Sequence, residues 1–331
     1  MIAASDILIV VPCLNEERTL PNLLAWLRAK HADAVVVVAD GGSTDGSRAL
    51  VEAAMLDWPS LRLLENPERY QSAGINGAVR AFGSGRQWLI RIDAHAAYPA
   101  DYVQTLIDAA LLQEADSVVV PMVTEGHGCF QMAVAAGQNS WLGTGGSPHR
   151  HVGKGSFVDH GHHALMRLAA FDSVGGYDAT FSHNEDAELD CRLRAKGFRI
   201  WLEPKAAVSY FPRSTATSLW RQYFNFGKGR ARTVLKHRLR LKIRHVLPLL
   251  IAPMIVAGLL ALPFSLFWHW AAPMVLPVVG WSVICQTAGC ALSFRDRSWC
   301  TLAAGSALMI MHTAWSLGFW SQIVSSAQID R

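Results

Sequence analysis

Residues 35–47 read VVVVADGGSTDGS, and this stretch decides the fold. Four valines and an alanine form a continuous apolar run, which is typical of a strand buried on both faces of a sheet. The run stops at Asp40, and the glycine-rich turn that follows takes the chain out of the sheet. We therefore expect Asp40 to lie at the carboxyl end of a central strand.

Strand-like and helix-like runs alternate on either side of this stretch. The alternation predicts a Rossmann-like α/β fold, with a mainly parallel sheet and helices on both of its faces. Ligands in such sheets bind beyond the carboxyl ends of the strands. The turns after Pro12, Ala39 and Ile92 should therefore form the binding crevice. The expected strands cover residues 7–12, 34–39, 61–65 and 88–92, and the expected helices between them cover residues 18–30, 47–56 and 72–82.

The later part of this domain is less regular. Residues 124–158 are rich in Gly, His and Ser, which predicts a loop. Order returns over residues 164–203, with a Gly-Gly-Tyr turn at 175–177 and a helix over 185–196. The six cysteines form no CxxC pair, so we expect reduced thiols rather than a disulfide framework or a zinc site.

The C-terminal part is strongly apolar. Hydrophobic residues make up 51% of the 331 residues, and mean hydropathy is +0.20. The excess is concentrated in three spans, at about 246–268, 271–294 and 300–324, each long enough to cross about 30 Å of hydrocarbon. Buried helices of a soluble domain are the alternative, but such helices would show polar faces. The sequence thus predicts a catalytic domain over 1–212 and a membrane domain over 246–331 with three transmembrane helices.

A basic stretch connects the two domains. No Asp or Glu occurs between Glu203 and Asp296, while basic side chains recur through residues 228–244. We expect residues 213–245 to form a basic amphipathic segment in the membrane interface. Because this stretch abuts an apolar span, it is not expected to bind nucleic acid. The basic side chains are Lys228, Arg230, Arg232, Lys236, Arg238, Arg240, Lys242 and Arg244.

The same charges predict the orientation in the membrane. The connection after the second span carries Arg295 and Arg297, whereas the connection before it carries His269 and no Lys or Arg. The positive-inside rule places the two arginines in the cytosol and His269 outside. We expect a multi-pass protein of the inner (cytoplasmic) membrane, with its catalytic domain cytosolic and its C-terminus external. The start of the chain shows no signal peptide.

Two acidic motifs stand where this topology predicts a site. Asp93 follows a strand, and in extended chain Asp93 and His95 point the same way, so the pair could share one divalent ion. Carboxylate plus imidazole suits Mn²⁺ at least as well as Mg²⁺. Turn capping remains an alternative for Asp40, and a hydrogen-bonded loop position remains one for His95.

The second motif, HNEDAELD over residues 183–190, opens a helix. Acids at the start of a helix and bases at its end complement its dipole, which accounts for Glu188, Asp190 and Arg194. The dipole does not account for Asp186, which follows the Gly-Gly-Tyr turn and should face the crevice.

Together these motifs resemble glycosyltransferase family 2, the inverting GT-A type. The resemblance covers about residues 5–205. Within the family the chain is most similar to the ExoA-like exopolysaccharide (succinoglycan-type) glycosyltransferases, which share the DAHA form, a GRART-like segment (229–233 here) and apolar C-terminal spans. The segments that carry the resemblance read VVPCLNEERTLPNLL, VVVVADGGSTDGS, LIRIDAH and VGGYDATFSHNEDAELDCRLRAKGFRIW.

The resemblance assigns roles to particular residues. It implies that Asp186 is the catalytic base and that Asp93 and His95 occupy the DxD site, which binds metal and diphosphate. His95 stands where the usual motif has Asp, which leaves the metal's identity open. The other implied donor contacts are Pro12, Asn15 and Glu16 at the nucleoside, Asp40 at the uracil and Asn76 near the diphosphate.

The resemblance also implies an activity. We expect a hexosyltransferase that adds one sugar, glucose from UDP-glucose in a β-linkage, to a polyprenyl-diphosphate-linked saccharide in exopolysaccharide biosynthesis. The chain lacks the QxxRW signature of processive members. Other polysaccharide-assembly proteins are possible partners. The residues expected to meet the acceptor or the interface are Glu185, Trp220, Arg230 and Arg232.

Three other functions are alternatives to this activity. A polyprenyl-phosphate sugar synthase, with the same donor and a bare lipid phosphate as acceptor, remains open. A nucleotidyltransferase would need a Gly-rich, basic N-terminal loop, but residues 13–17 read CLNEE. A transporter is disfavoured because the three spans offer no acid or base for an ion path.

Overall fold

The computed structural model describes residues 3–146, 153–241, 243–265, 267 and 271–329. The chain forms two compact units, one of residues 1–122 and 152–210 and the other of residues 123–151 and 211–331. This division differs from a single boundary at residue 212, because residues 123–151 cluster with the C-terminal part. Three residues that the predictions name lie outside the described residues: His269, expected outside the membrane, the C-terminal Arg331 and the basic Lys242.

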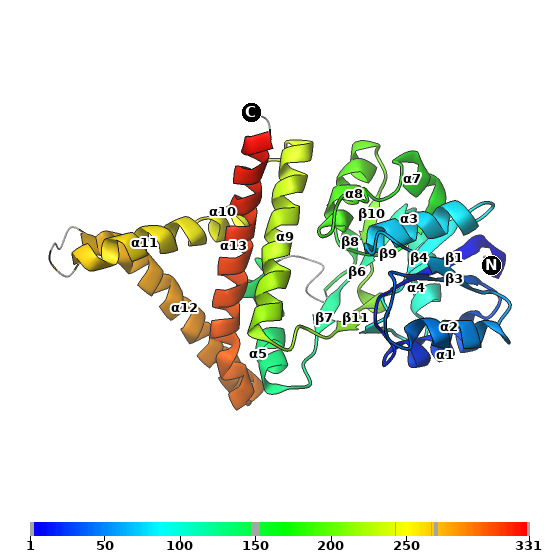
Figure 1. The fold of residues 1–331 in the computed structure, drawn as a ribbon, viewed down its shortest axis with the longest axis horizontal. Helices are drawn as coiled ribbons and strands as arrows, with labels where there is room; N and C mark the ends of the chain where they lie inside the picture. Colours follow the sequence, from blue (N-terminus) through cyan, green and yellow to red (C-terminus); the bar gives the residue numbers. More distant parts are fainter. Residues whose placement is uncertain (1–2, 147–152, 242, 266, 268–270, 330–331) are drawn as a thin grey trace. The chain divides into compact units, whose positions relative to one another are not determined.

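An eight-stranded sheet forms the centre of the first unit, with the strand order β3-β2-β1-β4-β9-β6-β10-β8 (Figure 1). The first four of these strands are parallel, and β9 runs antiparallel between β4 and β6. The predicted mainly parallel sheet is therefore confirmed. Its strands are β1 (Ile7–Cys13), β2 (Val35–Asp40), β3 (Leu61–Glu65), β4 (Trp88–Arg91), β6 (Ser117–Val120), β8 (Ser156–Phe157), β9 (His162–Arg167) and β10 (Ile200–Leu202).

Helices cover both faces of this sheet, as the alternating pattern predicts. One core cluster joins the sheet to α1 (Leu20–His31), α2 (Ser47–Met55) and α4 (Tyr102–Leu112). The other joins it to α3 (Gln71–Phe82), α7 (Leu168–Ser173) and α8 (Glu185–Ala195). Burial of both faces explains why the central strands read as apolar runs without alternation.

Short elements complete the first unit. Strands β5 (Ala96–Ala97) and β11 (Val208–Tyr210) pair antiparallel in a second, small sheet. The short 3₁₀ helices are η1 (Ala4–Asp6) and η3 (Pro204–Ala206), and the chain leaves the unit through β7 (Met122–Thr124).

The second unit is helical. The segment 124–158, predicted as loop, contains α5 (Cys129–Gln138) and α6 (Trp141–Thr144), so that prediction is wrong for these residues. Its small apolar residues form a helix because α5 packs on α13 and η5. The other helices are α9 (Ala216–His237), α10 (Ile243–Leu249), α11 (Ile251–Ser265), α12 (Ala272–Asp296), η5 (Trp299–Ala303) and α13 (Ala304–Ile329).

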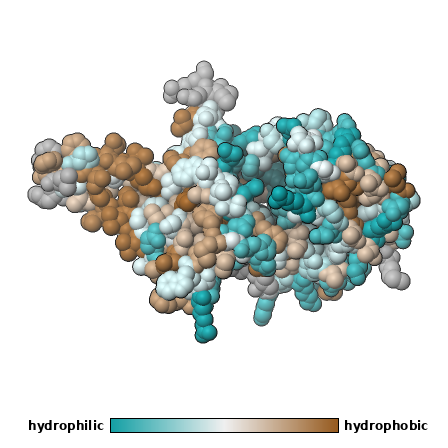
Figure 2. Space-filling model, turned by 60° about the horizontal axis from the view of Figure 1, so that its bottom comes forward, coloured by the Kyte–Doolittle hydropathy of each residue, from teal (hydrophilic) through white to brown (hydrophobic). Residues whose placement is uncertain are grey.

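Three apolar helical segments could span a membrane, as predicted. They cover Val246–Ser265, Ala272–Asp296 and Trp299–Ala327. Figure 2 shows a hydrophobic surface over α11 and α12, where large side chains such as Leu260, Phe264 and Leu276 are exposed. An exposed apolar surface of this kind matches contact with lipid rather than water.

Helices α9 and α13 lie side by side with their backbones close together (Figure 1). A Cβ atom at Gly227 would stand 2.0 Å from the carbonyl oxygen of Trp315, and one at Gly318 would stand 2.0 Å from that of Phe224. Glycine is therefore required at both contacts. Residues 213–245 were expected to form an interfacial segment. Most of them form α9, which packs against α13 within the second unit.

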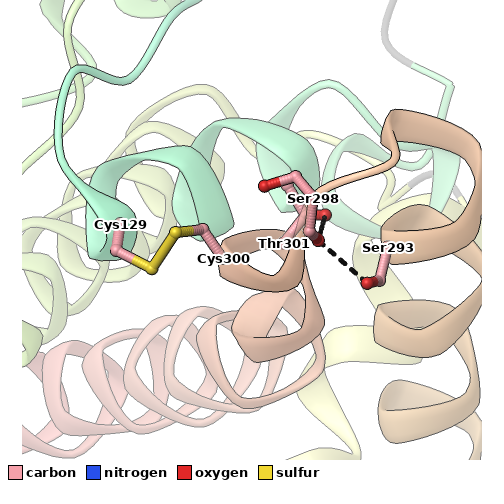
Figure 3. The surroundings of a disulfide bond; sticks show 5 residues. All are labelled: Cys129, Ser293, Ser298, Cys300 and Thr301. Carbon is pink, nitrogen blue, oxygen red and sulfur yellow. Dashed lines mark hydrogen bonds between the residues drawn. A yellow bond between two sulfur atoms is a disulfide. The ribbon is translucent and has the colours of Figure 1, made fainter.

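A disulfide joins Cys129, at the start of α5, to Cys300 in η5 (Figure 3). The turn that carries Cys300 is held by Ser298, whose carbonyl oxygen accepts hydrogen bonds from Ser293 Oγ at 2.9 Å and Thr301 Oγ1 at 2.8 Å. The expectation of reduced thiols is therefore wrong for this pair. Spacing could not reveal it, because the two cysteines are 171 residues apart.

Replacing Gly318 with Ala should destabilise the second unit, because the added methyl group overlaps the Phe224 carbonyl. We expect a lower apparent melting temperature for the detergent-solubilised protein. Gly280→Ala in α12 is the matched control, since its Cβ would meet nothing within 4 Å. Equal melting temperatures for the two variants would contradict the close approach of α9 and α13.

Candidate active site

A pocket lies at the carboxyl ends of β1, β2 and β4, where the topology predicts ligand binding. Four expected donor-site residues, Pro12, Glu16, Asp93 and His95, line it. Arg69 adds a positive charge that no motif in the sequence indicated. The remaining lining residues are Cys13, Leu14, Ala39, Asn66 and Gln71.

Asn15 and Asp40 build the loops beside this pocket. Asn15 adopts a left-handed backbone (φ 58°), and its Oδ1 accepts a hydrogen bond from the Thr44 amide at 2.8 Å. Asp40 Oδ1 accepts from the backbone amide of Ser43 at 3.1 Å and from its hydroxyl at 2.5 Å. The carboxylate of Asp40 thus caps its own turn, which is the alternative that the sequence left open.

Asn76 has partners other than a diphosphate. Its Nδ2 donates to the Tyr177 carbonyl at 2.7 Å, and its Oδ1 accepts from the Tyr177 amide at 2.9 Å. Gly176 is equally constrained, since a Cβ there would stand 2.6 Å from Asn76 Oδ1. Asn76 therefore fastens α3 to the Gly-Gly-Tyr turn, and both polar groups of its side chain are used in doing so.

Arg91 is the centre of the site's charge network. It ends β4, and its side chain is only 5% exposed. Its Nε donates to Asp93 Oδ1 at 3.0 Å, and its Nη1 donates to Asp186 Oδ1 at 2.8 Å. One guanidinium therefore connects the expected metal-binding carboxylate to the expected base.

The base lies at the start of α8. Asn184 precedes the helix in a left-handed conformation (φ 65°), and Glu185 and Asp186 open it. A helix N-terminus stabilises negative charge. Burial alone would raise the pKa of Asp186, but the positive charges of Arg91 and His163 outweigh it and hold that pKa below its usual value. Asp186 is thus ionised and able to accept a proton.

Glu185 differs from its neighbour. Burial, together with the charge of Asp186, raises the pKa of Glu185 to about 7. Its Oε1 lies 4.0 Å from Arg91 Nη1, at the limit of an ion pair. Two adjacent carboxyl groups with separated pKa values are typical of sites that move protons.

Two histidines on β9 were not singled out from the sequence. His162 Nε2 lies 3.5 Å from Asp93 Oδ2, and His163 Nδ1 lies 3.4 Å from Asp186 Oδ1. The pairing of β9 with β6 is irregular between Val118 and Val119. Such bulges redirect side chains near active sites, and here two consecutive residues both approach Asp186.

The donor atoms present fit a divalent cation at Asp93. Arg91 and Gln71 hold its Oδ1, the latter with Nε2 at 2.9 Å. Oδ2 accepts only a long hydrogen bond from Arg91 Nη2, at 3.4 Å, and is the oxygen more open to a metal. The ring of His95 is half exposed beside Glu16, with Nδ1 3.0 Å from Oε1. Among the described residues no three His, Cys, Asp or Glu side chains form a complete metal site. A site completed by substrate phosphates and water is typical of Mg²⁺.

The residues expected near the acceptor fall in different units. Glu185 is in the first unit, whereas Trp220, Arg230 and Arg232 lie on α9 of the second. Trp220 is 38% exposed, and the two arginines are half buried.

Comparison with known proteins identifies the family. The family model for Glycosyl transferase family 2 matches residues 8–175. The chain is 46% identical over 325 residues to the succinoglycan biosynthesis protein ExoA of Rhizobium meliloti (strain 1021), covering 98% of this chain and 96% of that protein. The chain belongs to glycosyltransferase family 2.

One solved structure is similar to this glycosyltransferase in fold, and one further protein is similar to it in sequence. The mannosyltransferase PcManGT from Pyrobaculum calidifontis, solved with GDP-Man and Mn²⁺, superposes with a TM-score of 0.59 at 17% identity, covering 97% of this chain and 87% of that one. A Methanococcus voltae protein, a dolichyl N-acetyl-α-D-glucosaminyl phosphate 3-β-D-2,3-diacetamido-2,3-dideoxy-β-D-glucuronosyltransferase, is 20% identical over 243 residues, covering 69% of this chain and 74% of that protein. The GT-A fold and the glycosyltransferase activity expected from the sequence are confirmed.

One feature of the sequence indicates that Arg91 has a buried partner. A charged residue inside the apolar run WLIRID must find a buried partner, because an unpaired charge there is costly. The sequence does not tell which partner, since Asp186 is 95 residues away. The sequence pattern does not distinguish His162 and His163 from the Gly- and His-rich segment before them, so their place in the site could not be predicted.

Replacing Arg91 with Met should lower the free energy of unfolding by about 3–5 kcal/mol, because two largely buried carboxylates lose their counter-ion. Thermal melting of the purified glycosyltransferase measures the loss. Arg48→Met is the control, since Arg48 pairs with Glu52 and Glu65 on the exposed surface and should change the melting temperature little. Similar melting temperatures for both variants would show that Arg91 is not needed to hold the site together.

Proposed function

We propose that this glycosyltransferase transfers one sugar, glucose from UDP-glucose, to a polyprenyl-diphosphate-linked saccharide and forms a β-linkage. The observation that carries this proposal is the single guanidinium of Arg91, which binds Asp93 on the donor side and Asp186 on the other. A carboxylate beside the donor pocket and a second one at a helix start suit a direct displacement at the anomeric carbon.

The chain's own residues divide the chemistry between them. Asp186 accepts the proton of the acceptor hydroxyl as that oxygen attacks the anomeric carbon. Arg69 and Gln71 line the pocket, and Arg69 would contribute its positive charge to binding the diphosphate. A divalent cation, Mn²⁺ or Mg²⁺, held by Asp93 and His95 would neutralise charge on the leaving diphosphate. One displacement inverts the anomeric centre, so an α-linked donor gives a β-linked product.

The relatives support the choice of acceptor. The name of the R. meliloti protein places it in succinoglycan biosynthesis, which supports a role for this chain in exopolysaccharide biosynthesis. The name of the M. voltae protein describes a lipid-linked sugar as acceptor and a β-linked product. Such an acceptor lies at a membrane surface, and three apolar helical segments suit an enzyme anchored there. Other polysaccharide-assembly proteins are its expected partners.

A polyprenyl-phosphate sugar synthase is the second candidate. It would use the same donor and the same Asp93 region, but its acceptor is a phosphate rather than a sugar hydroxyl. A phosphate oxygen is already ionised at neutral pH and needs no general base. The pairing of Asp186 with Arg91 and His163, which keeps a carboxylate ionised in the site, therefore favours a hydroxyl acceptor.

A transfer assay tests this function. Purified protein is mixed with Mn²⁺, with each of a panel of radiolabelled UDP-, GDP- and TDP-sugars, and with lipid extract from cells that lack this gene. We expect label to enter the lipid fraction from UDP-glucose, and EDTA to stop it. Asp186→Asn should lower the rate by about 10²–10⁴-fold while UDP still binds, because a general base contributes about that much.

Glu188→Gln is the control on the same helix, since Glu188 bonds to Arg192. Its turnover should stay near that of the wild type. Transfer from a different nucleotide sugar would show that the donor is not UDP-glucose. Near-normal transfer by Asp186→Asn would show that Asp186 is not the base. Label on bare polyprenyl phosphate would establish the second candidate function.

We also propose an inner-membrane topology in which the catalytic unit and the Arg295–Arg297 loop are cytosolic and the C-terminus is external. The basic side chains of α9, including Arg230 and Arg232, would lie on the cytosolic side near anionic headgroups, with Trp220 in the interface.

Reporter fusions test this topology. A fusion after Arg331 should read as external and one at Asp296 as cytosolic. Cys300 lies three residues beyond Arg297, and its disulfide with Cys129 is atypical of the cytosol. The fusion at Asp296 therefore also shows on which side of the membrane this disulfide lies. The opposite reporter pattern would overturn the charge argument and place the disulfide outside.

A further inference from the structure

His163 is fully buried between the sheet and α8, and it has a partner at each ring nitrogen. Its Nε2 lies 2.8 Å from Asp190 Oδ1, and its Nδ1 lies 2.7 Å from the hydroxyl of Tyr177. Asp190 is 1% exposed, and its second oxygen, Oδ2, accepts a hydrogen bond from the Gly161 amide at 3.2 Å. The imidazole is therefore fixed in place and in orientation.

This fixed ring faces the candidate base. Asp190 follows Asp186 by one helical turn, so both side chains lie on the same face of α8. His163 Nδ1 stands 3.4 Å from Asp186 Oδ1, the same oxygen that accepts the hydrogen bond from Arg91. Arg91 thus bonds to Oδ1, and the buried ring of His163 stands beside the same oxygen at ion-pair distance.

The other oxygen of the base is less engaged. Asp186 Oδ2 lies 3.9 Å from His162 Nδ1, which is too long for a hydrogen bond. The side chain of Asp186 is 19% exposed, so part of it reaches the open site. With Oδ1 held, Oδ2 is the atom that can take a proton from an acceptor hydroxyl.

We propose that His163, held by Asp190 and Tyr177, is a positioning residue for the base: it fixes Asp186 Oδ1 and thereby presents Oδ2 to the acceptor. This inference rests on the proposed function, since it assumes that Asp186 is the base. The proton from the hydroxyl goes to Oδ2, and the freed oxygen forms the bond to the anomeric carbon as the bond to the diphosphate breaks.

A purely structural staple between β9 and α8 is the competing interpretation. The two differ in what they require of residue 163. A staple needs only the bond to Asp190, which a glutamine can make because its Nε2 reaches about as far as the histidine Nε2. Positioning also needs the contact at Nδ1, which glutamine cannot reproduce at the same time.

His163→Gln therefore separates the two roles. We expect the variant to fold and to bind UDP with Mn²⁺ as the wild type does. Its kcat for transfer to the lipid extract of the deletion strain should fall by about 10–100-fold with little change in KM for the donor, a loss comparable to that caused by removing an outer-shell partner that orients a functional side chain. Asp190→Asn should also lower kcat, because the ring then loses its charged anchor.

Glu188→Gln is again the matched control, because Glu188 is fully buried on the same helix and bonds to Arg192. It should lower the melting temperature without lowering kcat. Wild-type kcat in His163→Gln would overturn the positioning role and leave only the staple. If the wild-type protein transfers no sugar from any donor while the Nε2 proton of His163 exchanges slowly with solvent, the proposed function fails rather than the geometry.

A second measurement does not depend on activity. In protein labelled with ¹⁵N-histidine, the Nε2 proton of His163 should give a downfield, slowly exchanging signal, because it is buried and hydrogen-bonded to Asp190. The signal should vanish in His163→Gln, which assigns it, and shift in Asp190→Asn. Rapid exchange of this proton with solvent would contradict the fixed ring on which the inference depends.

Discussion

The ion pairs of Arg91 are the interaction on which the rest of the site depends. A guanidinium only 5% exposed cannot remain in the sheet without acceptors, and two carboxylates at 2.8 and 3.0 Å supply them. Burial alone would lower the pKa of Arg91, but the charges of Asp186 and Asp93 hold it well above its usual value. In return Asp93 and Asp186 stay ionised in a largely buried place. Removing the guanidinium would leave both carboxylates without compensation.

This constraint links elements that are far apart in the chain. Arg91 ends a central parallel strand, so its partners must lie at the carboxyl edge of the sheet, where the loops after β1 and β2 form the donor pocket. The start of α8 meets the same edge because Asn76 fastens the preceding Gly-Gly-Tyr turn to α3. His163 anchors the next turn of α8 through Asp190. The base is thereby fixed from both sides of the helix start.

The sequence predicted what local patterns determine. Asp93 and Asp186 follow a strand and a turn that their neighbours define, and the structure brings both to one guanidinium. Partners distant in the chain were not predictable. The family resemblance implied that Asn76 lies near the diphosphate, but it did not reveal that both polar groups of this side chain bond to Tyr177, 101 residues away. The disulfide between Cys129 and Cys300 and the clustering of residues 123–151 with the C-terminal helices likewise depend on packing that no spacing encodes.

The central claim is that Arg91 bonds at the same time to Asp93, the carboxylate on the donor side, and to Asp186, the base. An experimental structure of the protein with UDP and Mn²⁺ tests it most directly. We expect the ion between Asp93 and the diphosphate, the uracil beside the loops after β1 and β2, and Asp186 still bonded to Arg91 without touching the metal. A metal bound by Asp186, or an Arg91 that has released it to bind the diphosphate alone, would contradict this account.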